Sequence, residues 1–361
     1  MTVDAAPAPA RTFIRSDFMV FGICAVAVGM AAVTRFANVP SVLAFVVAGA
    51  AVAALASLVG RSVEQLGDRF GPGATGVLQG ALGNLPELFI GFFALKAGLV
   101  SVVQSAIIGS ILSNILLVLG LAFVAGGLRH GTQKFNSERA RTTMVLMVLA
   151  TGALVLPSLA SYVHTPAEPH EKSLSIFVAI VLLLVFALSL PASLKRSAAA
   201  ANDVHMEAPR WPVWVAVGLL AVASGCAALV SDWFVYALEP AIDALGISQA
   251  FAGLVIVAIA GNAIENVIGI KLAFKGQADY ALSVVINSPL QIALVLAPAL
   301  VLLSLLTAST LTLVFAPMLI MAVAITVIAV AFIVFDGEST WLEGATLVAL
   351  YVIIASVFWW G

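Results

Sequence analysis

Two glutamates, Glu87 and Glu265, are the acidic residues that lie within long apolar runs of this chain. Each belongs to the same short motif, Gly-Asn-x-x-Glu, which runs from Gly83 to Glu87 and again, 178 residues later, from Gly261 to Glu265. An ionisable group at bilayer depth costs at least a few kcal/mol, and such groups are usually functional. A duplicated intramembrane carboxylate therefore predicts a substrate or ion site.

The repetition extends beyond the two glutamates. The same offset aligns the segment 109–113, Gly-Ser-x-x-Ser, with the segment 287–291, Asn-Ser-x-x-Gln, without a gap. Each segment follows its glutamate at the same distance and lies in the next apolar run. The chain is therefore predicted to contain one half used twice, with matched polar residues on neighbouring helices.

The amino-acid composition defines the class of protein that carries these motifs. Hydrophobic residues make up 62% of the 361 residues and charged residues 9%, which excludes a soluble globular protein and indicates a polytopic membrane protein. The net charge of -2 gives no sign of a nucleic-acid partner. Cys24 and Cys226 both lie in apolar segments, so neither a disulfide nor a metal-thiolate site is predicted.

Apolar segments of about 20 residues, the length needed to cross a bilayer, can be placed along most of the chain. They predict an all-α polytopic membrane protein of about eleven transmembrane helices. The predicted spans are 18–35, 40–59, 74–97, 99–125, 142–160, 173–192, 212–230, 250–274, 279–304, 309–334 and 341–360.

The distribution of basic residues tests this arrangement independently, because cytoplasmic loops are enriched in Lys and Arg. Arg35, Lys96 and Lys172 fall outside when the N-terminus is cytoplasmic. The basic residues that then fall inside are Arg11, Arg15, Arg61, Arg69, Arg129, Lys134, Arg139, Arg141, Lys195, Arg196, Arg210 and Lys275. We therefore expect a multi-pass protein with a cytoplasmic N-terminus, and the compact loops favour a prokaryotic plasma (inner) membrane.

The helices that carry the two glutamates are the third and the eighth, so they cross the membrane in opposite directions and the repeat is inverted. Such repeats are related by a two-fold axis in the membrane plane, and Glu87 and Glu265 are expected to face one another near the midplane. The predicted organisation is a cytoplasmic tail over 1–17, an extra first helix over 18–35, a first inverted five-helix repeat over 40–193, a cytoplasmic linker over 194–211 and a second inverted repeat over 212–361.

Two carboxylates surrounded by neutral oxygens suit a hard cation, because Ca²⁺ takes roughly six to eight oxygen ligands. The two carboxylates supply the charge, and amide and hydroxyl oxygens from the same and adjacent helices supply the other ligands. The candidate ligands are Glu87, Glu265, Asn84, Asn262, Ser110, Ser288, Gln291, Gln104, Ser113 and Asn114. The predicted spans contain no His, so Ca²⁺, Na⁺ or Mn²⁺ fits better than a soft transition metal, and no cofactor is expected.

Two prolines lie beside the candidate site, Pro86 in the first motif and Pro289 in the later segment. A proline inside a helix removes one hydrogen bond, so the carbonyls of Leu82 and Val285 are expected to be free to act as further ligands. A low-dielectric environment also favours the protonated form of a carboxylic acid, so the two glutamates can bind either a cation or protons. Competition at one site is sufficient for exchange.

At these motifs the chain resembles the calcium/cation antiporter superfamily, and most closely its cation/proton exchanger branch, the Ca²⁺/H⁺ antiporters. The segment from Gly83 to Gly120 is similar to the first signature of that branch, GNATEL followed by a Phe-Ala-Leu-Lys run and then by Gln, Gly-Ser and Ser-Asn. The segment from Gly261 to Pro298 is similar to the second, GNAAEH followed by a Gly-Ser-Ser-x-Gln-Ile-Ala-Leu run. Together the two segments cover about a fifth of the chain.

The resemblance implies a secondary active antiporter of eleven helices that exports Ca²⁺ from the cytosol in exchange for H⁺. It also implies that Glu87 and Glu265 are alternately cation-bound and protonated. The residues that match site-lining positions of the family are Asn84, Ser110, Asn262, Ser288 and Gln291, and Gln104 matches a motif glutamine. The chain departs from the family pattern at Pro86, Asn266, Asn287 and Pro289, where we expect its ion preference to be decided.

The residues leave other functions open. A Na⁺/H⁺ or K⁺/H⁺ antiporter, or a Na⁺/Ca²⁺ exchanger, would use the same fold and the same carboxylates. A passive channel would need a continuous polar pathway, whereas the polar residues cluster at one depth in both halves. An intramembrane enzyme would need a nucleophile with a base or a His-ligated metal, so enzyme function is not expected. The predicted partners are inorganic cations, protons and the lipid bilayer, with no nucleic acid.

Overall fold

A computed structural model of the chain describes residues 12–70, 78–200 and 210–360. Most of the predicted tail, the start of the third span and part of the linker therefore lie outside the described residues. The elements, in chain order, are α1 (Arg15–Phe36), α2 (Ser41–Phe70), η1 (Gln79–Gly83), α4 (Leu85–Lys96), α5 (Val100–Leu112), η2 (Ser113–Val118), α6 (Leu119–His130), β1 (Gln133–Lys134), α7 (Ser137–Tyr162), η3 (Glu168–His170), α8 (Glu171–Ala200), α9 (Val213–Leu245), α10 (Gln249–Phe251), η4 (Ala252–Val257), α11 (Ala258–Gly261), α12 (Ala263–Phe274), α13 (Ala278–Gln291), η5 (Ile292–Leu296), α14 (Ala297–Leu303), η6 (Ser304–Leu306), α15 (Pro317–Val334), β2 (Glu338–Ser339) and α16 (Trp341–Trp359).

The helices account for the predicted membrane spans. Within the described residues, nine helices are long and apolar enough to cross a membrane, and the bent pair formed by 249–261 and 265–274 makes a tenth. The remaining predicted span corresponds to η1 and α4, which run from Gln79 to Lys96. Counted along the chain, the helix with the first glutamate and the helix with the second are five spans apart, as an inverted repeat requires. The prediction of an all-α polytopic fold is confirmed.

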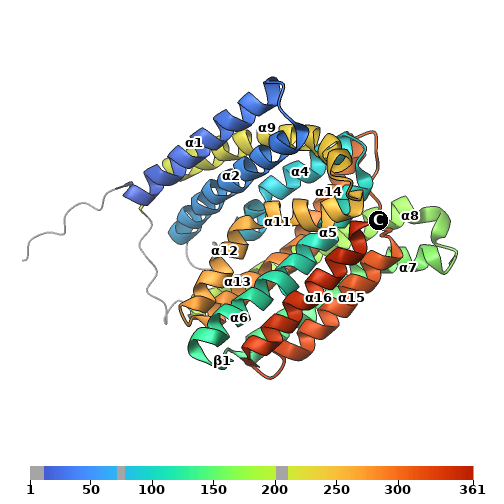
Figure 1. Ribbon diagram of the computed structural model, residues 1–361. Helices are drawn as coiled ribbons and strands as arrows, with labels where there is room; N and C mark the ends of the chain where they lie inside the picture. Colours follow the sequence, from blue (N-terminus) through green and yellow to red (C-terminus); the bar gives the residue numbers. More distant parts are fainter. Residues whose placement is uncertain (1–11, 71–77, 201–209, 361) are drawn as a thin grey trace, which may run out of the picture.

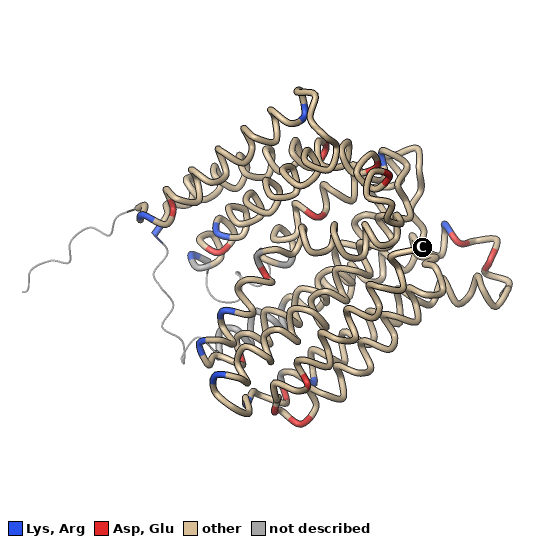
Figure 2. The backbone as a smooth tube through the Cα atoms, in the orientation of Figure 1, with Lys and Arg blue, Asp and Glu red and all other residues tan. Residues whose placement is uncertain are grey.

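The helices are arranged in layers around a central pair of broken helices. In Figure 1, α1, α2 and α9 lie along one side of the molecule, and α5, α6, α13, α15 and α16 lie on the other. The broken segments that contain α4, α11 and α12 run between these two groups (Figure 1). Figure 2 shows that charged residues gather at the ends of the helices, while acidic positions also occur in the interior. The fold therefore encloses acidic groups within an apolar bundle.

Each glutamate motif coincides with a break in a helix. The break before α4 is at Asn84, with φ -91° and ψ 16°, and the break before α12 is at Asn262, with φ -94° and ψ 17°. A new helix begins directly after each asparagine, so Glu87 and Glu265 both lie in a first helical turn. The positive end of a helix dipole stabilises an acidic side chain at that position. The repeated motif thus places each carboxylate at the N-terminus of a half-helix inside the bundle.

The expected effect of Pro86 was wrong. Pro86 does not interrupt a continuous helix, because it lies in the first turn of α4, where no intrahelical partner is lost. The carbonyl of Leu82 is not free, since it accepts a hydrogen bond from the backbone N–H of Asn84. The second repeat breaks in the same way at Asn262 with Ile264 in place of the proline. Pro86 is therefore compatible with the break and is not its cause. Pro289 lies inside α13, which continues to Gln291.

Glycines bring the two repeats into direct backbone contact where α5 crosses η4. A methyl group at Gly109 would lie 2.2 Å from the carbonyl oxygen of Leu254, and one at Gly253 would lie 2.4 Å from the carbonyl oxygen of Val102. Helices in membranes associate through small residues that permit such close approach. Because α5 carries Ser110 and η4 leads into the second motif, this crossing holds the two motifs together.

The tenth span was predicted to begin at residue 309, but α15 begins only at Pro317. The preceding residues are not helical, although Leu311, Leu313 and Phe315 are fully buried. Three side chains of the first repeat form hydrogen bonds with this backbone. Gln104 Nε2 donates to Thr312 O (3.0 Å) and Val314 O (2.9 Å). Ser158 Oγ donates to Leu313 O (2.9 Å) and accepts from Phe315 N (2.9 Å), and Ser175 Oγ accepts from Leu313 N (2.9 Å). Non-helical backbone is tolerated at membrane depth where protein groups satisfy it, and hydropathy alone does not detect such a segment.

Candidate cation site

The carboxylate of Glu87 is buried at the contact between the two repeats. Its Oε1 accepts hydrogen bonds from Asn262 Nδ2 at 2.5 Å and from Ser110 Oγ at 3.1 Å. Glu87 and Ser110 belong to the first repeat, whereas Asn262 belongs to the motif of the second. The two motifs therefore meet, with the glutamate of one repeat bound to the asparagine of the other. That Glu87 and Glu265 face one another stays a prediction.

Asn262 is the centre of this network. Besides Glu87, its Nδ2 faces Ser110 Oγ at 3.0 Å and Ala258 O at 2.9 Å. Its Oδ1 accepts from Asn114 Nδ2 at 2.9 Å and from Ser288 Oγ at 3.2 Å. Side chains from α4, α5, η2 and α13 thus converge on one amide. An Asn side chain that is fully buried needs such a set of partners.

Two oxygen atoms in the same network have no hydrogen-bond donor among the described residues. They are Glu87 Oε2 and Asn114 Oδ1, and both are buried. A buried acceptor without a partner is rare, because it loses its hydration and gains no hydrogen bond in return. Carboxylate and amide oxygens are the ligands that a hard cation prefers. The pair of orphaned acceptors therefore fits a cation whose ligands come from both sides of this network.

Glu265 occupies a different environment from Glu87. It lines a cavity of about 780 Å³, which we call the vestibule. The polar residues around the vestibule are Asp17, Ser57, Arg61, Glu64, Gln65, Gln79, Arg210, Glu265, Lys271, Ser283, Asn287, Ser288 and Gln291. Ser288 belongs both to the vestibule wall and to the network around Asn262, so the buried network adjoins the vestibule.

On the side away from the vestibule, the site is closed by apolar side chains. The cavity that touches Glu87 and Ser110 there is only about 20 Å³, and its other walls are apolar residues of α4, α5, η4, η5 and α14. Gly91 and Leu300 meet across it, since a methyl group at Gly91 would lie 2.8 Å from both methyl carbons of Leu300. The geometry is therefore asymmetric, with a broad opening toward Glu265 and an apolar seal beyond Glu87.

The remaining predicted ligands fall into separate positions. Gln291 lines the vestibule with Glu265. Asn84 lies at the first helix break, and its Nδ2 has no hydrogen-bond partner among the described residues. Ser113 Oγ donates to Ser110 O at 3.3 Å. Gln104 is not part of the network, because its amide nitrogen holds the backbone of residues 312–314. Ligation by these four residues stays a prediction.

Gly261 makes room for the side chain of Glu87. A methyl group at this position would lie 2.6 Å from Glu87 Cγ and 2.7 Å from Glu87 Oε1. The carboxylate of the first repeat therefore lies directly against the backbone of α11. Only glycine leaves this space, which explains why the motif begins with glycine in this repeat.

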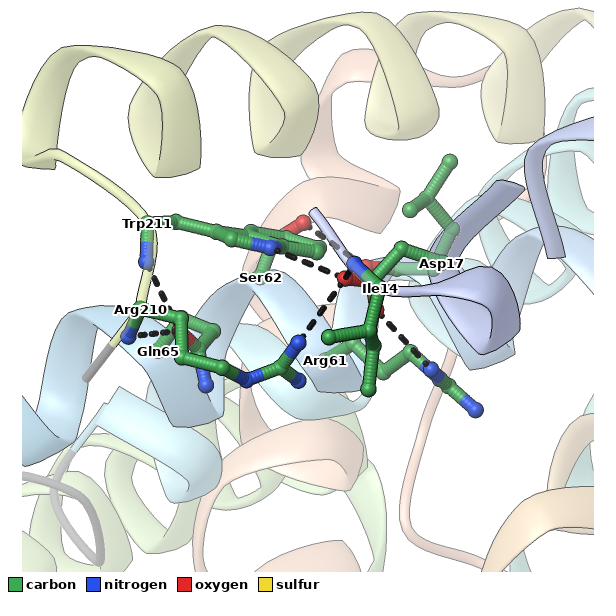
Figure 3. Close-up of polar contacts among 8 residues, drawn as sticks. Ile14, Asp17, Arg61, Ser62, Gln65, Arg210 and Trp211 are labelled. Carbon is green, nitrogen blue, oxygen red and sulfur yellow. Dashed lines mark hydrogen bonds and ion pairs between the residues drawn. The ribbon is translucent and has the colours of Figure 1, made fainter. Parts of the chain in front are cut away.

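The wall of the vestibule also includes a buried carboxylate, Asp17, that the sequence did not single out. Figure 3 shows the side chains around it. Asp17 is 1% exposed and lies in α1, which begins before the predicted residue 18. Arg210 Nη1 is 3.0 Å from its Oδ2, and Arg61 Nη1 is 3.4 Å from its Oδ1. Trp211 Nε1 and the backbone N–H of Ile14 also donate to it, at 3.4 Å and 3.0 Å. Four donors thus surround one carboxylate.

The same face of α2 also binds the backbone that leads into α9. Gln65 Oε1 accepts from the backbone N–H of Arg210 (2.8 Å) and of Trp211 (3.0 Å), and Arg69 Nε donates to Trp211 O (3.0 Å). Figure 3 shows Gln65 beside the backbone of Arg210 and Trp211, while Arg61 points toward Asp17. Polar residues repeated at every fourth position of α2 were the available signal, since such residues share one helix face. We call the contacts of Asp17 with Arg61, Arg210 and Trp211 the α1 clamp.

Fold and site together define an integral membrane protein built from two inverted helical repeats with one acidic motif in each. The family model described as sodium/calcium exchanger protein matches residues 40–195 and 215–360. The chain belongs to this family, and the resemblance seen at the two motifs is confirmed.

Curated relatives and solved structures agree with this assignment. The Ca(2+)/H(+) antiporter of Aphanothece halophytica is 36% identical over 332 residues, covering 87% of this chain and 89% of the relative. The Ca(2+)/H(+) antiporter ChaA of Bacillus subtilis is 36% identical over 343 residues, covering 94% and 98%. The structure of native YfkE matches with a TM-score of 0.80 at 34% identity, covering 94% of this chain and 99% of that chain. The crystal structure of the H+/Ca2+ exchanger CAX, with a TM-score of 0.76 at 17% identity and coverage of 95% and 92%, shares the fold.

Proposed function

We propose that this protein is a secondary active antiporter that moves Ca²⁺ out of the cytosol in exchange for H⁺. The observation that carries the proposal is the buried network in which Glu87 of one repeat meets Asn262 of the other, with Glu87 Oε2 and Asn114 Oδ1 left without a donor among the described residues. A hard divalent cation matches this set of oxygens. The names of the relatives, Ca(2+)/H(+) antiporters, point to the same substrates.

In the proposed mechanism, Glu87 and Glu265 bind either the cation or protons. The cation reaches Glu265 through the vestibule, and Ser288 connects this position with the network around Glu87. Protons that neutralise the carboxylates remove the charge that holds the cation, so the two substrates exclude one another. The apolar seal at Gly91 and Leu300 keeps the site closed on one side while the vestibule is open, as alternating access requires.

We assign the vestibule to the cytoplasmic side of a prokaryotic plasma membrane. Its mouth contains Arg61, Arg210 and Lys271, and it lies at the end of the bundle where α1 begins and α9 follows the linker. Loops enriched in Lys and Arg face the cytoplasm. The tail over 1–17 and the linker over 194–211 are cytoplasmic in the same proposal, and the first and second repeats span 40–193 and 212–361.

The test is exchange in proteoliposomes that hold a proton gradient reported by a pH-sensitive dye. Addition of Ca²⁺ is expected to dissipate the gradient, and Glu87→Gln or Glu265→Gln is expected to reduce the rate to background because each removes one of the two charges. Glu338→Gln is the control, since Glu338 lies in the exposed pair with Lys134. Dissipation by Na⁺ or K⁺ and not by Ca²⁺ would establish the monovalent antiporter of the same fold instead. Rapid exchange by both glutamine variants would refute the two-carboxylate mechanism.

A further inference from the structure

Asn114 supports the network in a way that has no counterpart in the second repeat. Asn114 lies in η2, which is π-helical, and the corresponding π-helix of the second repeat is η5. The offset of 178 residues that aligns the glutamates places Ile292 of η5 opposite Asn114. The backbone irregularity is therefore repeated, while the polar side chain is not. A π-helical turn inside an α-helix is frequent at functional sites.

The two hydrogen bonds of Asn114 Nδ2 fix the direction of the neighbouring amide. One goes to the carbonyl of Ser110 at 2.9 Å and the other to Asn262 Oδ1 at 2.9 Å. An amide nitrogen is only a donor, so it must face an oxygen of Asn262. Together with the carbonyl of Ala258 and the hydroxyl of Ser288, this contact turns the Nδ2 of Asn262 toward Glu87 Oε1. With the amide reversed, two oxygens would face each other at Glu87, and the contact would be repulsive.

The equivalent contact with the roles of the two repeats exchanged would join Asn84 to Glu265, and it would lack a counterpart of Asn114. Asn84, which corresponds to Asn262, has an unpartnered Nδ2 among the described residues, and Glu265 lies in the vestibule wall. When inverted repeats exchange conformations, the reciprocal contact joins Asn84 to Glu265. Ile292 has no donor with which to orient Asn84 as Asn114 orients Asn262.

We propose that Asn114 is a positioning residue that orients Asn262 onto Glu87 and thereby favours the vestibule-open state over its reciprocal. This inference rests on the proposed function and deepens it. It states that one side chain makes the vestibule-open state more stable than the state open to the other side of the membrane. A ligand can shift such an equilibrium only through its different affinity for the two states, so the intrinsic bias sets how much binding energy the exchange cycle must supply.

The experiment measures accessibility rather than transport. In a background with Cys24 and Cys226 replaced by alanine, Ser283→Cys reports the vestibule and Ala106→Cys reports the sealed side, where Ala106 lines the small cavity beside Glu87. A membrane-impermeant thiol reagent is applied from each side of oriented vesicles in the presence of a Ca²⁺ chelator. The ratio of the Ala106→Cys rate to the Ser283→Cys rate follows the population of the reciprocal state.

Asn114→Leu keeps the approximate shape of the side chain and removes its donor. Loss of one net hydrogen bond is expected to raise the labelling ratio about fivefold. Adding Ile292→Asn to this variant transfers the donor to the second repeat and is expected to raise the ratio further. If Asn114→Leu is not recovered folded, Asn114→Ala gives the same readout.

An unchanged ratio in Asn114→Leu, or a ratio that Ile292→Asn lowers, would overturn the proposal. The result is independent of the transported ion when the labelling buffer also replaces Na⁺ and K⁺ by choline, because no candidate metal cation is then present. A protein that exchanges Na⁺ rather than Ca²⁺ would contradict the proposed substrate and leave this labelling result intact. An unchanged labelling ratio in a protein that exchanges Ca²⁺ for H⁺ would refute the role of Asn114 alone.

Discussion

The two repeats carry the same motif and break their helices with nearly the same backbone angles, yet they place their glutamates in different surroundings. Glu87 lies against Gly261 and is held by Asn262 and Ser110, whereas Glu265 lines a large cavity. Equivalent sequence therefore does not give equivalent environment within one conformation. The difference is what a transporter with inverted repeats needs, because each repeat presents the site to one side of the membrane only.

The largest expected effect concerns the reactivity of the two carboxylates. A water-soluble carbodiimide with a nucleophilic amine, applied from the vestibule side, is expected to modify Glu265 at least about tenfold faster than Glu87, because Glu265 lines the vestibule and Glu87 is buried. Peptide mass spectrometry of the modified protein measures both rates in one sample. Equal rates for the two glutamates would show that their surroundings do not differ in accessibility. Asp17, which is buried, is the internal control for reagent penetration.

The second-largest expected effect is a difference in stability between alanine substitutions at the two glycines that begin the motifs. Gly261→Ala places a methyl group 2.6 Å from Glu87 Cγ, so it is expected to destabilise the folded protein by about 2–3 kcal/mol. Gly83→Ala is the matched control, because its methyl group would meet the flexible end of Gln79 and should cost less than about 1 kcal/mol. Thermal unfolding in detergent measures both. A larger loss for Gly83→Ala would show that Glu87 does not depend on the backbone of α11.

The smallest expected effect concerns the first helix of each repeat, α2 in the first and α9 in the second. In α2, Arg61 belongs to the α1 clamp, and the position that corresponds to it in α9 is the exposed Glu239. Asp17→Asn is expected to cost about 1–2 kcal/mol, less than for a fully buried pair, because Arg61 and Arg210 retain partial contact with water. Glu239→Gln is expected to change thermal stability by less than about 0.5 kcal/mol. Equal effects would show that the clamp adds no stability.

The sequence predicted the features that depend on local pattern. Hydropathy located the helices, and the duplicated motif located both glutamates and the asparagine that binds one of them. The inverted arrangement followed from counting spans, because each crossing reverses the direction of the chain. These predictions succeeded since each rests on the chemistry of a single segment in an apolar environment.

Other features depend on which segments meet in space, and local pattern does not contain that information. Asp17 looked like part of a polar tail, but it is buried against α2 and the segment that leads into α9. Gln104 matched a motif of site residues, yet it pairs with the backbone at Thr312 and Val314. The asymmetry of Glu87 and Glu265 was also hidden, because identical motifs give no sign of which repeat is closed. Pro86 suggested a free carbonyl at Leu82, but that carbonyl accepts a hydrogen bond from the backbone N–H of Asn84.

The buried extended segment before α15 sets a register between the two repeats. Ser158 both donates to Leu313 O and accepts from Phe315 N, while Ser175 accepts from Leu313 N, so these hydroxyls replace the neighbouring strand of a sheet. A slip of one residue would turn the carbonyl of Leu313 and the N–H of Phe315 away from Ser158 and leave these buried backbone groups unpaired. Hydrogen bonds thereby hold the segment in one position along α5, α7 and α8. That part of the bundle can serve as the stationary frame against which the rest of the transporter moves.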